Sequence, residues 1–337
     1  MTGRGLVLLL PGQGSQYQGM AVELYEREPV FATVADEFFA AMGPEGKLVR
    51  NDWLSDTPGV PIDDGTRAQP LLFIIGYAIG TVLHSRGLQP VRLIGHSVGE
   101  LAAAALAGVF DLPAAGRILA ARSRVLAGAP AGGMLAVAAA PATVEAVVDP
   151  VWAAKGLVVG AVNAPAQTIL TGPEPELSLV EEALWTAGLT SRRVRSAQPF
   201  HSPVLNAAAD VFEQAVAAER LRPPRIPITS AWTGRPVESA DGLRPAFWAR
   251  QMAEPVRFWE AVSSLPDDGE FTMVEAGPGN LLSVIARRHP SVRARRSEVF
   301  GLLPTEGKAA WPVWLAGLEK LAEQSISPRG SQNCSAR

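Results

Sequence analysis

The stretch that most constrains the fold is residues 91–100, where an apolar run ends in Gly-His-Ser-Val-Gly and continues into an alanine-rich helical segment. A strand, a Gly-x-Ser-x-Gly turn and a helix together form a nucleophile elbow. Its glycines, Gly95 and Gly99, allow a sharp turn and close backbone packing, which lift the serine hydroxyl into the open. The pattern therefore predicts that Ser97 is a nucleophile and that the N–H of Val98 points toward an oxyanion formed beside it.

A second glycine-rich turn follows the first predicted strand, Gly5–Leu10, whose continuous apolar run is typical of a buried parallel strand. The turn, Pro11–Gln16, lacks the Gly-x-Gly-x-x-Gly spacing of a dinucleotide site, and no P-loop lysine follows it. One interpretation is a tight turn with no further role. The interpretation we favour is close backbone approach to an acyl group, with the Gln13 N–H as a second oxyanion donor.

The order of the predicted elements divides the chain. Up to residue 131, strands alternate with helices, as in an α/β domain with a parallel sheet. From 132 to 198 the order becomes β-α-β-β-α-β, the ferredoxin-like split unit, with a helix predicted over 142–155 and a last strand over 191–195. We therefore predict a large α/β domain (1–131 and 199–324), a small ferredoxin-like domain inserted at 132–198, and a disordered polar tail at 325–337.

Composition excludes several classes of protein. Hydrophobic residues make up 47% of the 337 residues and charged residues 19%, which is typical of a globular chain. The net charge of −3 argues against nucleic acid as the main partner. The single cysteine, Cys334, leaves no disulfide framework or thiolate metal site, and the four histidines include no close-spaced metal-ligand pair. We found neither a signal peptide nor a run of about 20 apolar residues, so we expect a cytoplasmic monomer without a metal or cofactor and without membrane contact.

A serine nucleophile needs a base, and elimination points to His201. His96 precedes the serine at the elbow, where its side chain is expected to point away and support the turn. His84 lies in a predicted helix and His289 in an arginine-rich run. His201 lies between two prolines where the small domain returns the chain to the large one, although a lone histidine with a purely structural role is the ordinary alternative. No acid is placed to complete a triad, so we expect a Ser–His dyad whose histidine is oriented by a backbone carbonyl.

These residues resemble the malonyl-CoA:acyl carrier protein transacylases and the acyltransferase domains of polyketide synthases. The similarity runs in order over roughly residues 6–320, and it rests on Pro11–Gln16, Gly95–Glu100, Arg122-Ser123, Asn163, His201 and Glu275–Gly279. The resemblance implies an α/β-hydrolase-like domain with a ferredoxin-like insert. It also implies that Ser97 is acylated from a CoA thioester, that His201 acts as base and then acid, and that the amides of Gln13 and Val98 form the oxyanion hole.

The resemblance also assigns residues around the acyl group. Arg122 would grip the free carboxylate of a malonyl-type group, because a guanidinium binds a carboxylate bidentately. By position on its helix alone, it could equally be a solvated arginine. Phe200 matches the malonyl-type pattern before the histidine, since a bulky ring narrows the pocket, although the preceding Gln-Pro departs from the usual residues. Met134 and Asn163 are expected to contact substrate. The backbone carbonyl of Arg257 is expected to orient the histidine.

The implied partners are an acyl-CoA and an acyl carrier protein, in a ping-pong transfer that serves fatty-acid or polyketide synthesis. Because carrier proteins are usually acidic, two arginine clusters are candidate docking faces, with plain solvated faces as the alternative: Arg192, Arg193 and Arg195, and Arg287, Arg288, Arg293, Arg295 and Arg296. Three other functions stay open. They are a serine esterase or thioesterase, an acyltransferase that moves a non-malonyl group between two carrier proteins, and a non-catalytic carrier-binding module. The end of the chain soon after its last predicted helix suggests a free-standing enzyme acting in trans.

Overall fold

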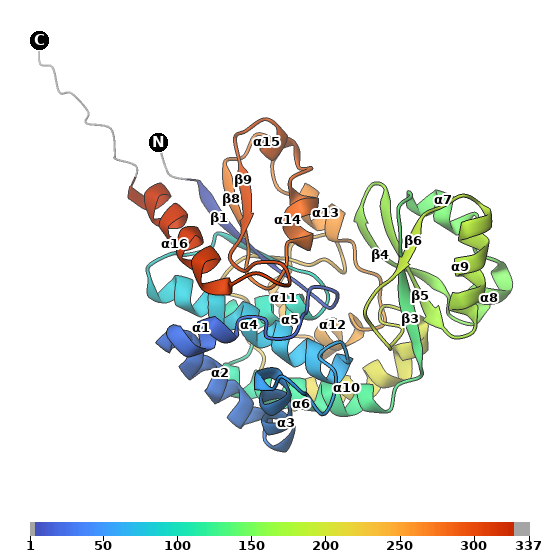
Figure 1. Ribbon diagram of the computed structural model, residues 1–337, viewed down its shortest axis with the longest axis horizontal. Coiled ribbons are helices and arrows are strands. Elements are labelled where there is room, and N and C mark those ends of the chain that lie inside the picture. The colour runs from blue at the N-terminus through green and yellow to red at the C-terminus, as the bar shows by residue number, and fades with distance from the viewer. Residues whose placement is uncertain (1–3, 327–337) are drawn as a thin grey trace, which may run out of the picture.

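The computed structural model describes residues 4–326, which form two lobes, each built on its own β-sheet (Figure 1). The larger lobe holds a five-stranded sheet in the order β7-β2-β1-β8-β9, and all four pairings in it are parallel. Its strands are β1 (Gly5–Leu10), β2 (Arg92–Gly95), β7 (Ile228–Thr229), β8 (Phe271–Glu275) and β9 (Glu298–Gly301). The predicted α/β fold with a parallel sheet is confirmed.

The register of the central strands places the two glycine-rich turns side by side. Leu10, the last residue of β1, pairs with Gly95, the last residue of β2. Because parallel strands end at the same edge of a sheet, the turn after β1 and the elbow after β2 leave the sheet together. β1 can occupy the centre because Val7 to Leu10 are all fully buried, as its uninterrupted apolar run predicts.

Helices surround this sheet. Those before the small lobe are α1 (Val22–Arg27), α2 (Pro29–Met42), α3 (Pro44–Leu54), α4 (Gly65–Ser85), α5 (Val98–Leu106) and α6 (Leu112–Ala127). Those after it are η1 (Pro203–Leu205), α10 (Asn206–Ala217), α11 (Ser239–Gly242), α12 (Pro245–Arg250), α13 (Phe258–Ser263), α14 (Leu281–Ala286), α15 (Pro290–Arg293) and α16 (Ala310–Ile326).

Helix α4 forms the centre of the core. Within the described residues it is the one helix long and apolar enough to cross a membrane, but 78% of its most apolar window is buried inside the protein, as in a core helix. The sequence predicts that this helix begins at Gln69 with Pro70 in its first turn, but it begins four residues earlier, at Gly65. The Asp64 side chain accepts a hydrogen bond from the Thr66 N–H (2.8 Å) and caps the helix there, so Pro70 lies inside the helix.

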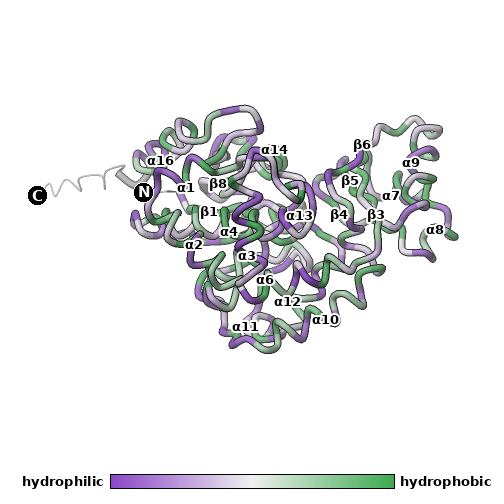
Figure 2. Tube along the Cα trace, turned by 60° about the horizontal axis from the view of Figure 1, so that its bottom comes forward, coloured by the Kyte–Doolittle hydropathy of each residue, from purple (hydrophilic) through white to green (hydrophobic). Residues whose placement is uncertain are grey.

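The smaller lobe holds a four-stranded antiparallel sheet in the order β4-β5-β3-β6 and its own hydrophobic core, and the turned view of Figure 2 shows it beside the larger lobe. Its elements are β3 (Gly132–Val137), α7 (Pro141–Glu145), α8 (Pro150–Ala154), β4 (Val158–Ala164), β5 (Gln167–Pro173), α9 (Glu176–Thr186) and β6 (Ser191–Arg193). This is the predicted ferredoxin-like arrangement. All four strands fall within residues 132–198, while the exact domain limits stay predictions.

The structure differs from the sequence-based expectations at several element boundaries. The single helix expected over 142–155 is broken in two, because a residue before proline disfavours the helical conformation and Asp149 instead caps α8. The last strand of the insert ends at Arg193, two residues early. Strand β9 was missed, and α16 continues to residue 326, so the first two residues of the expected tail are helical. The rest of that tail lies outside the described residues.

Candidate active site

The elbow has the predicted geometry. Ser97 has φ 54° and ψ −122°, a conformation that costs free energy in a non-glycine residue, and α5 begins at the next residue. A Cβ at Gly95 would lie 2.3 Å from the Glu100 backbone, and one at Gly99 would lie 2.1 Å from the Leu10 carbonyl. Only glycine fits at either position, so the two glycines hold the strained serine at the mouth of a cavity.

His201 comes from the far side of the insert and meets the serine. Its Nε2 lies 2.8 Å from the Oγ of Ser97, and its side chain is buried. Its backbone also has a positive φ of 65°, and its N–H donates to the Met252 carbonyl (2.8 Å). The chain thus holds both members of the predicted pair in uncommon backbone conformations, which is typical of functional sites.

Two backbone carbonyls orient the histidine. The Nδ1 atom of His201 lies 2.9 Å from the carbonyl oxygen of Gln251 and 2.8 Å from that of Glu254. These acceptors place the ring proton on Nδ1 and leave Nε2 free to accept from the serine hydroxyl. Over residues 4–326, no carboxylate side chain bonds to this ring, so the arrangement is a dyad.

The expectation that Arg257 supplies the orienting carbonyl was wrong. Arg257 is the N-cap of α13, and its carbonyl oxygen accepts from the N–H of Ala261 in the first turn of that helix. The carbonyls that reach the histidine come from three and six residues earlier, where the chain leaves α12. The sequence segment was identified correctly, but its acceptor positions were not.

Burial keeps the candidate base neutral. The pKa of His201 is lowered to about 4, chiefly by desolvation and also by the positive charges of His96 (when protonated) and Arg122, while the hydrogen bonds from Nδ1 to two carbonyls oppose the shift. At neutral pH the imidazole is therefore uncharged and able to accept the serine proton.

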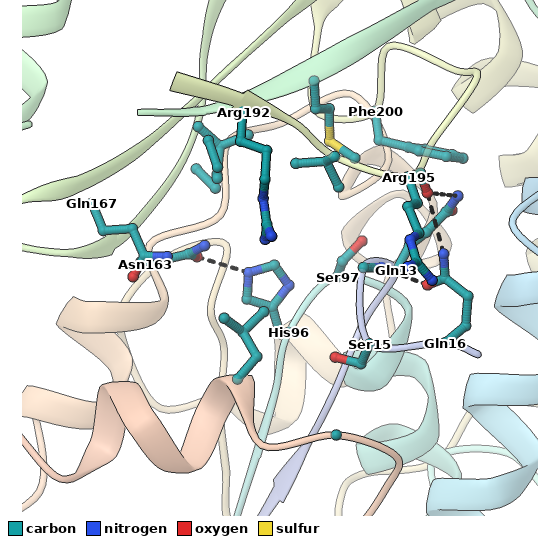
Figure 3. A pocket seen from close by; sticks show the side chains of 18 of the residues that line it. Gln13, Ser15, Gln16, His96, Ser97, Asn163, Gln167, Arg192, Arg195 and Phe200 are labelled. Carbon is teal, nitrogen blue, oxygen red and sulfur yellow. Dashed lines mark hydrogen bonds between the residues drawn. The ribbon is translucent and has the colours of Figure 1, made fainter. Parts of the chain in front are cut away.

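His96 and Asn163 form a second buried pair beside the dyad. The Nε2 of His96 lies 2.9 Å from the Oδ1 of Asn163, as the dashed line in Figure 3 shows. His96 makes no hydrogen bond to Ser97 in the described structure, in agreement with its assignment as a supporting residue. Desolvation lowers its pKa, so it too is neutral. Asn163 lines the cavity as expected, but its side-chain oxygen is already used to fix His96.

The two candidate oxyanion donors lie at the neighbouring strand ends. Neither the Gln13 N–H nor the Val98 N–H has a protein acceptor within the part of the chain that is described. A Cβ at Gly12 would lie 2.4 Å from the His96 carbonyl and 3.0 Å from the Ser97 Cβ, so the turn after β1 packs directly on the elbow. Gln13 is fixed by its side-chain amide, which donates to the Asp63 carbonyl (3.2 Å). Two free N–H groups next to the nucleophile suit an oxyanion.

Arg122 is a buried cation to which no carboxylate of the described residues is paired. It is 3% exposed, so the interpretation as a solvated arginine is wrong. Its Nε donates to the Oε1 of Gln69 (2.5 Å), and its guanidinium lies 5.2 Å from the Phe212 ring centroid. No carboxylate pairs with it in residues 4–326. Desolvation alone lowers its pKa to about 9, which still leaves it charged at neutral pH.

A narrow cleft contains both this cation and Ser97. It is lined by Ser97, Val98, Leu101, Arg122, Trp248 and Gln251. An unpaired buried charge costs free energy, and such a charge is expected where a ligand of opposite charge pairs with it. The cleft is too narrow for a water molecule in this structure, so an anionic group attached to Ser97 would enter it only with a shift of the lining side chains.

A larger cavity of about 720 Å³, also lined by Ser97 and His201, is formed by residues of both lobes. Figure 3 shows Ser97, His96 and Gln13 around it, with Arg192 projecting into it from β6. The small lobe contributes an apolar wall that includes Met134, Ala136, Ala161, Ile169 and Val194. Phe200 closes the side next to His201, where it is 1% exposed, so the expected placement of both Met134 and Phe200 at the cavity is observed.

The chain matches the family model of the acyl transferase domain over residues 7–316. It belongs to that family. Over 323 residues the chain is 33% identical to a component of the phenolphthiocerol/phthiocerol polyketide synthase of Mycobacterium tuberculosis, a match that covers 93% of this chain and 21% of the relative. The chain thus spans about a fifth of the length of that relative.

Solved structures agree with this assignment. The acyl transferase domain of SpnD, in complex with 2-(pent-4-yn-1-yl)malonyl, superposes with a TM-score of 0.87 at 28% identity, covering 96% of this chain and 77% of that one. The malonyl CoA-acyl carrier protein transacylase of Coxiella burnetii shares the fold, with a TM-score of 0.80 at 23% identity over 95% of this chain and 98% of that one.

Two residues of this acyl transferase domain were missed by sequence reasoning. Gln69 is buried within α4, where its side chain accepts from Arg122 and donates to the Gln13 Oε1 (3.2 Å). Gln251 lines the cleft, and its main-chain carbonyl orients His201. A glutamine inside the apolar run of α4 was the one available signal, because buried amides need polar partners.

Proposed function

We propose that this acyl transferase domain moves a malonyl-type acyl group from CoA to the phosphopantetheine thiol of an acyl carrier protein, through an acyl-serine intermediate. The observation that carries the proposal is Arg122, a buried guanidinium without a carboxylate partner among residues 4–326, in the cleft that contains Ser97. The carboxylate of a malonyl group would accept two hydrogen bonds from this guanidinium and neutralise its charge, while the thioester carbon lies at the serine.

The first half-reaction follows from the geometry. The Ser97 hydroxyl passes its proton to the Nε2 of His201 as its oxygen attacks the thioester carbon, and the carbonyl electrons move to an oxyanion held by the Gln13 and Val98 N–H groups. When the oxyanion collapses, the carbon–sulfur bond breaks and the imidazolium returns the proton to the CoA thiolate. The product is an acyl-serine and free CoA.

The second half-reaction runs in reverse with a new thiol. The carrier thiol gives its proton to His201, its sulfur attacks the acyl-serine carbonyl, and the proton returns to Ser97 as the ester bond breaks. The cavity between the lobes accommodates the thiol arm and limits the access of water to the ester.

The competing functions fit the site less well. A carboxylate that completes a triad, as esterases commonly have, contacts no part of His201 within the described chain. A neutral acyl group would leave the charge of Arg122 buried and unpaired, which argues against a carrier-to-carrier transfer of non-malonyl chains. A non-catalytic module has no need of a strained serine bonded to a neutral histidine.

Phe200 supports the choice of unsubstituted malonyl over larger α-substituted groups. A Cβ at Gly65 would lie 3.2 Å from the Phe200 Cζ, so the ring is wedged against the start of α4 and narrows the cavity beside His201. We expect Phe200→Ala to raise the rate with methylmalonyl-CoA relative to malonyl-CoA.

The test of the function is a donor panel. Wild-type protein is assayed with malonyl-, methylmalonyl- and acetyl-CoA and with acyl carrier protein donors, and transfer to a holo carrier protein is measured. We expect kcat/KM to be highest for malonyl-CoA. A preference for acetyl-CoA or for a neutral acyl-carrier donor would refute the proposal.

Carrier docking is proposed at the arginines in and just after β6, which line the large cavity, whereas the arginines between residues 287 and 296 do not line it. Arg193 is neutralised by Glu174 and Glu181, and Arg195 pairs with Glu306, so Arg192 is the candidate without an ion pair in the described residues. Charge reversal of Arg192 should raise KM for carrier protein more than for malonyl-CoA, with reversal of Arg287 as the control. Equal changes in the two KM values would exclude docking there.

A further inference from the structure

The side chain of Gln251 contains a buried polar atom that the fold does not satisfy. The residue is 6% exposed, and its Nε2 atom has no hydrogen-bond partner within residues 4–326. A buried amide without a partner is destabilising, so the fold alone gives no reason for an amide at this position. An aliphatic side chain of the same length would pack there at less cost.

The surroundings of this amide show what it could bind. Gln251 lines the narrow cleft together with Arg122 and Ser97. Arg122 uses its Nε for Gln69, and within the described chain its two terminal nitrogens make no hydrogen bond. The cleft thus offers unpaired donors from a guanidinium and an amide. A set of donors around a cation is complementary to an anion that has several acceptor positions.

We propose that the Gln251 side-chain amide donates a hydrogen bond to the carboxylate of the acyl group held by Arg122, and that Gln251 is a specificity-determining residue. A carboxylate bound bidentately by a guanidinium keeps a free lone pair on each oxygen, which a third donor can use. This role rests on the proposed malonyl-type function.

Gln251 also links the acyl carboxylate to the base. Its main-chain carbonyl accepts from the Nδ1 of His201, while the residue also lines the cleft that contains Arg122. A substitution at this position leaves the main-chain carbonyl in place. A loss specific to the malonyl carboxylate can therefore be separated from a loss of histidine orientation, which would slow every acyl donor alike.

The test compares the acylation of Ser97 by malonyl-CoA and by acetyl-CoA, which lacks the carboxylate, using intact mass at early times. The variants are Gln251→Leu, which removes the amide, and Gln251→Glu, which is nearly isosteric and places a carboxylate beside the malonyl carboxylate. The control is Trp314→Phe. This substitution, in α16, removes another buried donor that has no partner in the described structure.

We expect Gln251→Leu to lower the malonyl-to-acetyl rate ratio about tenfold, as the loss of a hydrogen bond to a charged group should, and Gln251→Glu to lower it further. The melting temperature of Gln251→Leu should not fall, and Trp314→Phe should leave the ratio unchanged. If the wild-type malonyl-to-acetyl rate ratio is high and Gln251→Leu leaves it unchanged, the proposed role of Gln251 is wrong while the proposed function stands. This holds even if the variant acylates more slowly with both donors. A wild-type ratio near one would refute the proposed function and this role with it. If Gln251→Leu fails to fold, the result with Gln251→Glu decides.

Discussion

The Nε2 of His201 lies 2.8 Å from the Oγ of Ser97, although 104 residues separate the two in sequence. The insert that separates them forms the second lobe and returns the chain at the cavity. Ser97 is held at the end of one parallel strand, and His201 by hydrogen bonds to the segment that follows α12. Residues from three distant segments thus form one candidate catalytic pair.

The backbone strain at Ser97 should lower the free energy of unfolding by a measurable amount. With φ 54° and ψ −122°, the residue has a conformation that glycine adopts far more easily. We expect Ser97→Gly to be more stable than Ser97→Ala by about 1 kcal/mol, because alanine keeps the strain and glycine releases it. Urea unfolding of both inactive variants measures the difference. Equal stabilities, or a more stable alanine variant, would contradict the strained elbow.

The low pKa of His201 makes a prediction about pH. A protonated imidazole cannot accept the serine proton, so activity is lost as pH falls through the pKa of His201, which is about 4 rather than the usual 6.5. We expect the rate of Ser97 acylation at pH 5.5 to lie within about twofold of that at pH 7.5. A histidine of ordinary pKa would lose roughly tenfold over the same range. Such a tenfold loss, in protein shown to be folded at pH 5.5, would contradict the neutral base.

Arg122 should contribute to function at the expense of stability. Replacing it with methionine removes an uncompensated buried charge while keeping most of the side-chain volume. We expect Arg122→Met to leave the unfolding free energy unchanged or raise it by about 1–2 kcal/mol, while malonyl transfer falls at least about 100-fold. Arg117→Met removes an exposed partner of Glu219, and it should change neither the unfolding free energy nor the rate of malonyl transfer by much. Marked destabilisation by Arg122→Met, or malonyl kinetics that stay normal, would refute this assignment.

Glu100, the third residue of α5, should give a pH dependence of stability. Burial raises the pKa of its carboxyl to about 7, against the opposing hydrogen bond from the Ala231 N–H. Between pH 4.5 and 7 the folded state keeps a proton that the unfolded state has lost, so stability falls as pH rises through this window. We expect wild-type protein to lose about 2–3 kcal/mol more than Glu100→Gln between pH 5 and pH 8. Parallel stability curves from urea titrations would show that Glu100 is ionised throughout.

The sequence predicts the features of this site that depend on local patterns. The two glycine-rich turns follow apolar strands. At the elbow, any side chain larger than glycine would clash with neighbouring backbone at both glycine positions, and the Gly-x-Ser-x-Gly spacing predicts this requirement. Arg122 was assigned through the resemblance alone, because a helical pattern with several arginines does not show which one is buried. Its burial among Gln69, Phe212 and the cleft depends on packing between α4, α6 and α10.

What the sequence could not predict depends on exact positions in loops. The orienting carbonyls belong to Gln251 and Glu254 instead of Arg257, because the helix α13 starts at that point and uses the Arg257 carbonyl for its own first turn. Strand β9 was missed because its few residues are only half-buried at the sheet edge and follow a run of arginines. Both features depend on the surrounding fold, and neither has a local sequence pattern that would predict it.

The most direct test is intact mass measurement of the protein after incubation with malonyl-CoA, followed by addition of a holo acyl carrier protein. We expect one malonyl adduct on the wild-type protein, located at Ser97 by peptide mapping and absent from Ser97→Ala. The adduct should persist in buffer and move to the carrier protein when that is added. Release of free malonate without an adduct, or an adduct that Ser97→Ala retains, would contradict acyl transfer through this serine.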